Sequence, residues 1–257
     1  MLISFSTAAL FPRTTLEALK LVKQSGFTEA EIMPQCRFDL TAGFAKQAGR
    51  TGIHVSSMHF PLVFFPVLYN PCKDMMKEAK KMVRDIVRTG EMLGTKIIVI
   101  HALAKLKPYQ KSLFAAPVLE NLQYLCDAAA TAGITIALEN NPKTEASDPE
   151  KQREEIKKID RENLVPAVDT TESFEAGIDP IVFLEKAKPR HMHLSDHDGR
   201  SKHLPVGRGN NNWSGIIGTL KAQGYSGLLV MEPVYQYFVE TAVEELSRSF
   251  AFLKNLL

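Results

Sequence analysis

The chain has 257 residues, of which 45% are hydrophobic and 23% charged; these are the proportions of a folded globular protein and exclude a largely disordered chain. Its formal net charge of +2 comes from lysines and arginines interspersed with acidic residues, and the lack of a basic block disfavours a nucleic-acid partner. The three cysteines are far apart and odd in number, which excludes a disulfide framework and predicts a reducing, cytoplasmic location.

Short apolar runs alternate with longer amphipathic runs along the chain, and glycines mark the return to each new strand. The first apolar run lacks the basic start of a signal peptide, and no run approaches the roughly 20 residues of a membrane helix, so we expect no membrane association. The predicted strands are 2–6, 29–33, 53–59, 96–101, 134–139, 164–169, 190–194 and 227–232. The predicted helices are 14–25, 39–50, 73–93, 117–131, 149–160, 179–188, 213–223 and 238–256.

Eight strand–helix units follow one another at a spacing near the ~30 residues of a βα unit. The nearly continuous apolar strands suit a parallel sheet that is buried on both faces, and right-handed crossovers close such a sheet into a barrel. An open doubly wound sheet is the alternative, but no GxGxxG follows the first strand. We therefore predict the α/β class, with a single (β/α)8 TIM-barrel domain over residues 1–257 and an active site at the C-terminal ends of the strands.

The segment 60–71 is rich in aromatic residues and proline and is too broken to form a helix. We interpret it either as a wall or lid of a pocket or as a contact between copies of the chain. The second interpretation makes a homo-oligomer plausible.

Six of the eight predicted strands end in a titratable residue of a type that binds metals. In a barrel these ends meet at one face, so residues that are distant in sequence converge on one cleft. A single such residue is more often a structural histidine or a helix cap. Six together place carboxylates so close that a divalent cation is the simplest way to stabilise them. The six residues are His59, His101, Glu139, Asp169, His193 and Glu232.

Three carboxylates and one imidazole form a donor set that is rich in oxygen. This combination favours Mn²⁺ or Mg²⁺ and tolerates Co²⁺ or Zn²⁺. No arrangement of thiolate ligands is apparent, because the cysteines are scattered.

Seven short motifs in this order resemble the xylose-isomerase-like TIM barrels. That superfamily includes sugar epimerases of the D-tagatose 3-epimerase type, inosose isomerases and dehydratases, hydroxypyruvate isomerase and endonuclease IV. The resemblance covers nearly the whole chain and is more specific for the superfamily than for one reaction. The motifs are the segments 57–61, 98–102, 137–140, 167–169, 191–196, 203–209 and 230–233.

The resemblance to the epimerases implies that Glu139, Asp169, His193 and Glu232 hold one divalent metal ion. The endonuclease IV branch instead binds three zinc ions and needs further ligands. His59, His101 and His203 match that pattern. However, Glu172 and Ser201 stand where the branch has a histidine and an aspartate, which disfavours a trinuclear cluster.

The sugar contacts of the epimerases are matched only in part. Glu145 stands at the offset of a family glutamate that binds substrate, six residues after Glu139. Glu172 and Gly199 replace the histidine and the arginine that family members carry, with Arg200 one residue further on. The resemblance therefore implies a rearranged sugar site, and the substrate of the named epimerases does not transfer to this chain.

We predict a metal-dependent isomerase or epimerase that acts on a sugar or sugar phosphate through a cis-enediolate. One of Glu139 and Glu232 removes a proton next to a carbonyl, and the other returns it from the opposite face. His59, His101 and His203 are candidates for contacts to substrate hydroxyl groups. Two further candidates, Glu145 and Arg208, would bind substrate, the arginine through a phosphate or carboxylate.

Other readings of the same residues remain open. An endonuclease IV-like multi-metal phosphodiesterase, a dehydratase and a non-catalytic sugar-binding barrel are the alternatives. We place His191 on the side of its strand opposite His193, and His197 in a solvated loop, so we expect both outside the site.

Overall fold

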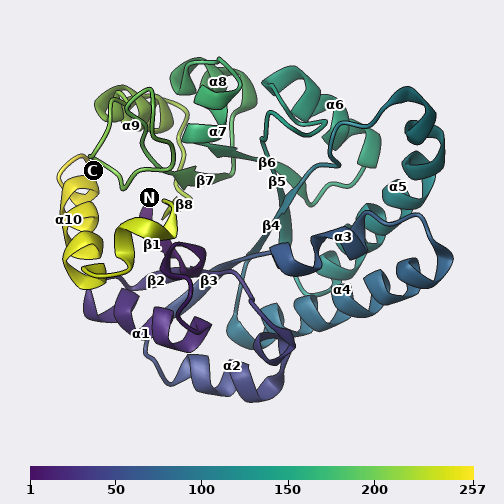
Figure 1. Cartoon of the computed structure of the whole chain (residues 1–257), viewed down its shortest axis with the longest axis horizontal. Helices are drawn as coiled ribbons and strands as arrows, with labels where there is room; N and C mark the ends of the chain where they lie inside the picture. The colour runs from purple at the N-terminus through teal and green to yellow at the C-terminus, as the bar shows by residue number, and fades with distance from the viewer.

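Eight parallel strands close into a barrel in the computed structural model, which describes residues 1–257 (Figure 1). Each strand pairs with the next one along the chain, and the last strand pairs with the first, Leu2 lying beside Leu228. The predicted TIM barrel is therefore confirmed. The strands are β1 Leu2–Ser6, β2 Glu29–Ile32, β3 His54–His59, β4 Ile97–His101, β5 Thr135–Glu139, β6 Leu164–Asp169, β7 His191–Leu194 and β8 Leu228–Met231.

Helices surround the barrel as an outer ring (Figure 1). None of them combines the length and the apolar character that crossing a membrane requires. The longer helices are α1 Thr15–Gln24, α2 Ala42–Gly49, α4 Lys73–Leu93, α5 Pro108–Thr131, α6 Pro149–Ile159, α8 Pro180–Ala187, α9 Trp213–Ala222 and α10 Ala242–Lys254. The short helices and 3₁₀ turns are η1 Thr7–Leu10, η2 Arg37–Leu40, η3 Leu62–Phe64, α3 Phe65–Leu68, α7 Thr170–Glu175 and η4 Tyr235–Phe238.

Several helical segments differ from the sequence prediction, among them α5, the segment 60–71 and α7. Helix α5 begins at Pro108, whereas the predicted helix begins at Pro117, which lies inside α5. A proline in the first turn needs no intrahelical donor, and the strong helix formers around Pro117 continue the helix through it. The segment 60–71, predicted to be free of helix, contains η3 and α3. Helix α7 was not predicted, because six residues are too few to show an amphipathic period.

The interior of the barrel is apolar on one side and polar on the other. Strands β4, β5 and β6 contribute the small apolar side chains of Val99, Ala137 and Ala167. Strands β2 and β7 instead contribute Glu31 and His191, both fully buried. The larger hydrophobic core lies between the sheet and the helices. A polar floor therefore lies beneath the C-terminal ends of the strands on one side of the barrel.

Hydrogen bonds from the helices fix the strands that carry the site. Gln152 of α6 is buried, and its Nε2 donates to the carbonyl oxygens of Leu138 (2.8 Å) and Ala167 (2.7 Å). These two residues lie on neighbouring strands, β5 and β6. Gly94 ends α4 in the left-handed conformation, with φ +76°, and returns the chain toward β4.

Candidate metal centre

Four residues from successive strands meet at the C-terminal mouth of the barrel. Glu139 and Asp169 are the last residues of β5 and β6, His193 lies in β7, and Glu232 directly follows β8. One ligand atom from each of the four lies within 4.8 Å of all the others. The structure thus brings together the four residues that the resemblance implies as metal ligands.

Two carboxylates of the cluster approach the same ring nitrogen of His193. Its Nδ1 lies 2.7 Å from Oε1 of Glu139 and 2.8 Å from Oε2 of Glu232. One nitrogen carries at most one hydrogen, so Nδ1 donates to only one of the two carboxylates. A divalent cation among the three groups satisfies both carboxylates and the nitrogen at once, so the donor set fits such an ion. Ser6 Oγ steadies Glu232 by donating to its Oε1 at 2.8 Å.

Asp169 is oriented by the backbone around it. Its Oδ1 accepts a hydrogen bond from the backbone N–H of Glu172 at 2.8 Å and caps α7. The buried side chain of Asn140 accepts from the Asp169 N–H at 2.7 Å. Oδ2 of Asp169 makes no hydrogen bond within the chain and is free to act as a ligand. Burial raises the pKa of Asp169 to about 7, and the charges of Glu139 and Glu172 add to the shift.

The remaining groups of the cluster are coupled through their charges. Burial alone would lower the pKa of His193, but the carboxylates of Glu232 and Glu139 raise it well above its usual value. Burial alone would raise the pKa of Glu139, but His193 and His101 hold it well below its usual value. The carboxylates around His193 therefore stabilise a positive charge on its imidazole.

Two further histidines approach the other side of Glu139. Its Oε2 lies 2.8 Å from Nε2 of His101 and 3.5 Å from Nε2 of His59. His59 Nδ1 lies 2.8 Å from the carbonyl oxygen of Phe60, which leaves Nε2 directed toward Glu139. His59, His101 and Glu139 form a second group that meets the distance requirement for a metal site, with Glu139 common to both groups.

A cavity of about 270 Å³ opens above these residues. Ligand pockets commonly measure about 300–1,000 Å³, so this cavity suits a small substrate. Its lining contains no lysine or arginine. Leu62 of the segment 60–71 forms part of its wall, which agrees with the first of the two interpretations of that segment. The lining residues are Ala8, Met33, His59, Leu62, His101, Glu139, Asp169, Glu172, His203, Glu232, Pro233, Val234 and Tyr235.

His203 and Glu172 face each other at one side of the cavity. Nε2 of His203 lies 3.6 Å from Oε1 of Glu172, and its Nδ1 lies 3.1 Å from Oγ of Ser195. Burial alone would lower the pKa of His203, but Glu172 and the charge of Asp169 raise it to about 9. Glu172 thus faces a protonated imidazole at the cavity wall.

Two candidate substrate ligands lie outside the cavity lining. Glu145 pairs with Nζ of Lys111 at 3.1 Å. Arg208 pairs with the buried carboxylate of Glu245 on α10. The structure therefore does not bring Glu145 or Arg208 to the cluster, because each charge is engaged elsewhere.

Sequence reasoning missed one buried acid and misplaced one histidine. Glu31 of β2 is fully buried, and its Oε1 lies 3.0 Å from Nε2 of His193. Its Oε2 lies 2.9 Å from Nε2 of His191. The placement of His191 opposite His193 was wrong, because residues two apart in a strand share a face. The same alternation in β2 could have revealed Glu31. Ala30 and Ile32 pack against the helices, so the residue between them points into the barrel.

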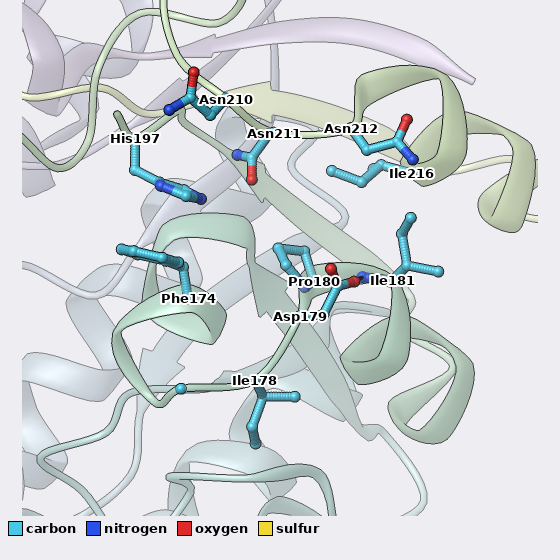
Figure 2. A pocket seen from close by; sticks show the side chains of 11 residues that line it. Phe174, Ile178, Asp179, Pro180, Ile181, His197, Asn210, Asn211, Asn212 and Ile216 are labelled. Atoms are coloured by element: carbon cyan, nitrogen blue, oxygen red, sulfur yellow. Dashed lines mark hydrogen bonds between the residues drawn. The ribbon is translucent and has the colours of Figure 1, made fainter. Parts of the chain in front are cut away.

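A separate pocket of about 380 Å³ lies beside α7, α8 and α9 (Figure 2). Figure 2 shows His197 above Phe174, and the ring centroids of the two are 3.5 Å apart. Asn210, Asn211 and Asn212 line the same pocket. It shares no lining residue with the cavity above the metal ligands, and His197 lies outside that cavity, as predicted.

The profile of the xylose isomerase-like TIM barrel family matches residues 19–256. The chain belongs to this family. An uncharacterized protein of Methanocaldococcus jannaschii is 30% identical over an aligned length of 163 residues, and the match covers 58% of this chain and 55% of that protein. The chain thus matches only about half the length of that relative.

Solved structures of sugar epimerases share the fold over the whole chain. A D-tagatose 3-epimerase-like protein superimposes with a TM-score of 0.81 at 22% identity, covering 100% of this chain and 97% of that one. A 3-keto-D-glucoside 4-epimerase of E. coli gives 0.81 at 19% identity and 99% of each chain. A D-psicose 3-epimerase of Clostridium cellulolyticum H10 gives 0.78 at 18% identity, covering 100% and 99%. At these identities the likeness concerns the fold alone.

Proposed function

We propose that this protein is a divalent-metal-dependent epimerase or isomerase of an unphosphorylated sugar, with residues 1–257 acting as one catalytic domain. The observation that carries the proposal is the pair of carboxylates around His193. Glu139 and Glu232 approach the same Nδ1 atom at 2.7 and 2.8 Å, and both line the small cavity. A pair of carboxylates at one reacting centre suits proton removal and proton return.

Each residue of the cluster has a distinct part in the proposed reaction. Glu139, Asp169, His193 and Glu232 would hold the ion, which when bound polarises the carbonyl and adjacent hydroxyl oxygens of the sugar. One of the two glutamates removes the proton next to the carbonyl, giving a cis-enediolate, and the other returns it. Return to the same carbon from the opposite face inverts that carbon, whereas return to the neighbouring carbon interconverts aldose and ketose.

The cavity lining supports an uncharged substrate. Proteins bind phosphate groups with arginine, lysine or a helix N-terminus, and no arginine or lysine lines this cavity. His101, Glu172 and His203 instead present groups that hydrogen-bond to hydroxyl groups. We therefore favour a free sugar over a sugar phosphate.

One observation favours a second candidate, a multi-metal phosphodiesterase. His59, His101 and Glu139 form a second group with metal-ligand spacing, and Glu139 could bridge two ions. Glu172 and Ser201 weigh against a third ion, because neither supplies the histidine or aspartate of the three-zinc pattern. The lack of lysine and arginine in the cavity lining also disfavours a phosphodiester substrate.

The number of bound ions separates the two candidates. Metal-stripped protein is loaded with Mn²⁺ or Zn²⁺ and its content is measured by mass spectrometry, together with Glu139→Gln, Asp169→Asn and a control, Glu162→Gln. Glu162 is an exposed carboxylate at the opposite end of the barrel. We expect about one ion per chain in the wild type and in the control, and weaker binding in the other variants.

Two or three tightly bound ions, together with nicking of abasic duplex DNA, would favour the phosphodiesterase. One ion with loss of water from the sugar would identify a dehydratase. One ion without solvent hydrogen exchange into any bound sugar would identify a non-catalytic binding protein.

A further inference from the structure

Glu31 places a carboxylate in the sealed interior of the barrel. It is fully buried in the middle of β2, and it does not line the cavity above the cluster. A buried carboxylate is costly unless cations or hydrogen-bond donors surround it. Its two oxygens face the Nε2 atoms of His191 (2.9 Å) and His193 (3.0 Å). Oε1 of Glu31 and Nε2 of His193 are close enough for an ion pair, but their geometry is not that of a hydrogen bond. Neither atom has a hydrogen-bond partner.

The position of Glu31 determines which nitrogen of His193 is available to a metal ion. A neutral imidazole has one N–H, and a carboxylate beside Nε2 favours that hydrogen on Nε2. The lone pair of Nδ1 then points toward Glu139 and Glu232, where the proposed ion binds. We infer that Glu31 is a positioning residue that fixes the tautomer and the orientation of His193 as a metal ligand. This inference rests on the proposed function.

His191 completes the arrangement by holding the second oxygen of Glu31. Its ring packs edge-on against His193, with centroids 5.1 Å apart and planes at 75°. His59 stacks on the same imidazole, with a centroid distance of 6.0 Å and an interplanar angle of 29°. Glu31 is therefore hydrogen-bonded at Oε2 and lies at ion-pair distance from His193 at Oε1, and the ring of His193 is confined by two other rings. Ligands held in this way by outer groups bind metals more tightly.

The same three residues could themselves be considered a second cation site, because Glu31, His191 and His193 also meet the distance requirement. Two observations favour the positioning role. All three side chains are fully buried, and neither Glu31 nor His191 lines the cavity. In addition, an ion at Nε2 of His193 together with one at Nδ1 would require the imidazole to lose both of its protons.

The test compares Glu31→Gln and Glu31→Asp with a matched control, Glu29→Gln, in the full-length protein. Glu29 lies two residues earlier in β2 and pairs with His54 at 2.8 Å, away from the cluster. Titration calorimetry gives the affinity and stoichiometry for Mn²⁺, and the thermal midpoint of the metal-free protein reports stability.

We expect Glu31→Gln to weaken Mn²⁺ binding roughly 10- to 100-fold while one ion still binds at saturation. Glutamine carries no charge, so its amide oxygen is a weaker acceptor for a hydrogen on Nε2 of His193 than the carboxylate is, and the Nε2–H tautomer loses its preference. Glu31→Asp should bind Mn²⁺ more tightly than Glu31→Gln but less tightly than the wild type. Aspartate keeps the carboxylate, but its shorter side chain holds it further from His193. Glu29→Gln should bind Mn²⁺ like the wild type.

An unchanged Mn²⁺ affinity in Glu31→Gln, with a lower thermal midpoint, would overturn the inference. Glu31 would then only stabilise the fold. Two ions in the wild type and one in Glu31→Gln would make Glu31 a metal ligand instead. If Glu31→Gln does not fold, Glu31→Asp decides, and wild-type affinity in that variant overturns the inference. A wild type that binds no Mn²⁺ would remove the proposed function and the inference together, whereas equal binding by wild type and Glu31→Gln removes the inference alone.

Discussion

Loading the metal-free protein with Mn²⁺ should release protons. Their number depends on how many of the four ligand residues are protonated before the ion binds. Ligands bind a metal only after deprotonation. Near pH 7 His193 is protonated, because the charges of Glu232, Glu139 and Glu31 outweigh burial and raise its pKa well above its usual value. Asp169, whose pKa burial raises to about 7, is partly protonated. Glu139 and Glu232 have lowered pKa values and are ionised already. Binding should therefore release between one and two protons, roughly one from His193 and a fraction of one from Asp169.

The pH dependence follows with a definite sign. Because the metal-free state holds more protons than the bound state, Mn²⁺ affinity should rise with pH through the neutral range. Calorimetry at pH 7 in buffers of different ionisation enthalpy counts the protons directly. Above about pH 8 the release should fall toward one, because Asp169 is then ionised before the metal arrives. Asp169→Asn should remove that change with pH. Release near zero at pH 7 would refute the assignment of His193 as a ligand.

Four further substitutions test the catalytic pair and the scaffold. Glu232→Gln should lower the rate of solvent hydrogen exchange into the sugar at least about 100-fold, because a proton-transfer group is lost, while the exposed Glu162→Gln leaves the rate unchanged. Gln152→Leu should lower the free energy of unfolding in urea by about 1–3 kcal/mol, since two buried carbonyls on β5 and β6 lose their donor; an unchanged free energy would contradict this. Gly133→Ala, at φ +64° with open space around it, should cost about 1–2 kcal/mol in the same assay. Gly207→Ala, at φ +85°, should cost more, because its methyl group would lie 2.8 Å from an aromatic ring of α10.

The fold and the convergence of the four candidate metal ligands follow from local patterns in the sequence. Eight apolar strands separated by amphipathic helices predict the barrel, and barrel closure brings all C-terminal strand ends to one face. Glu139, Asp169 and His193 stand at or near those ends, so their convergence requires no knowledge of the loops. The topology alone brings them together with Glu232, and their ligand atoms lie within 4.8 Å of one another.

The parts that the sequence does not reveal depend on loop paths or on register. Glu145 and Arg208 lie on loops, whose course is not fixed by the spacing from a strand end, and each meets a partner from another element. The partner of Arg208, Glu245, is 37 residues away on α10. Glu31 and His191 are brought together across the barrel interior by its closure, although they are 160 residues apart. Strand alternation shows that Glu31 points inward, but not which side chain it meets.

The most direct test of the central claim follows solvent deuterium into a sugar. Protein loaded with one Mn²⁺ per chain is incubated in D₂O with a panel of free ketohexoses, and the products are analysed by NMR after the protein and metal are removed. The account predicts an epimer or isomer that carries deuterium at the carbon that received the returned proton. The Glu139→Gln variant should form neither the product nor the deuterium label. Mn²⁺-loaded protein that leaves every sugar of the panel unlabelled and unconverted would contradict it.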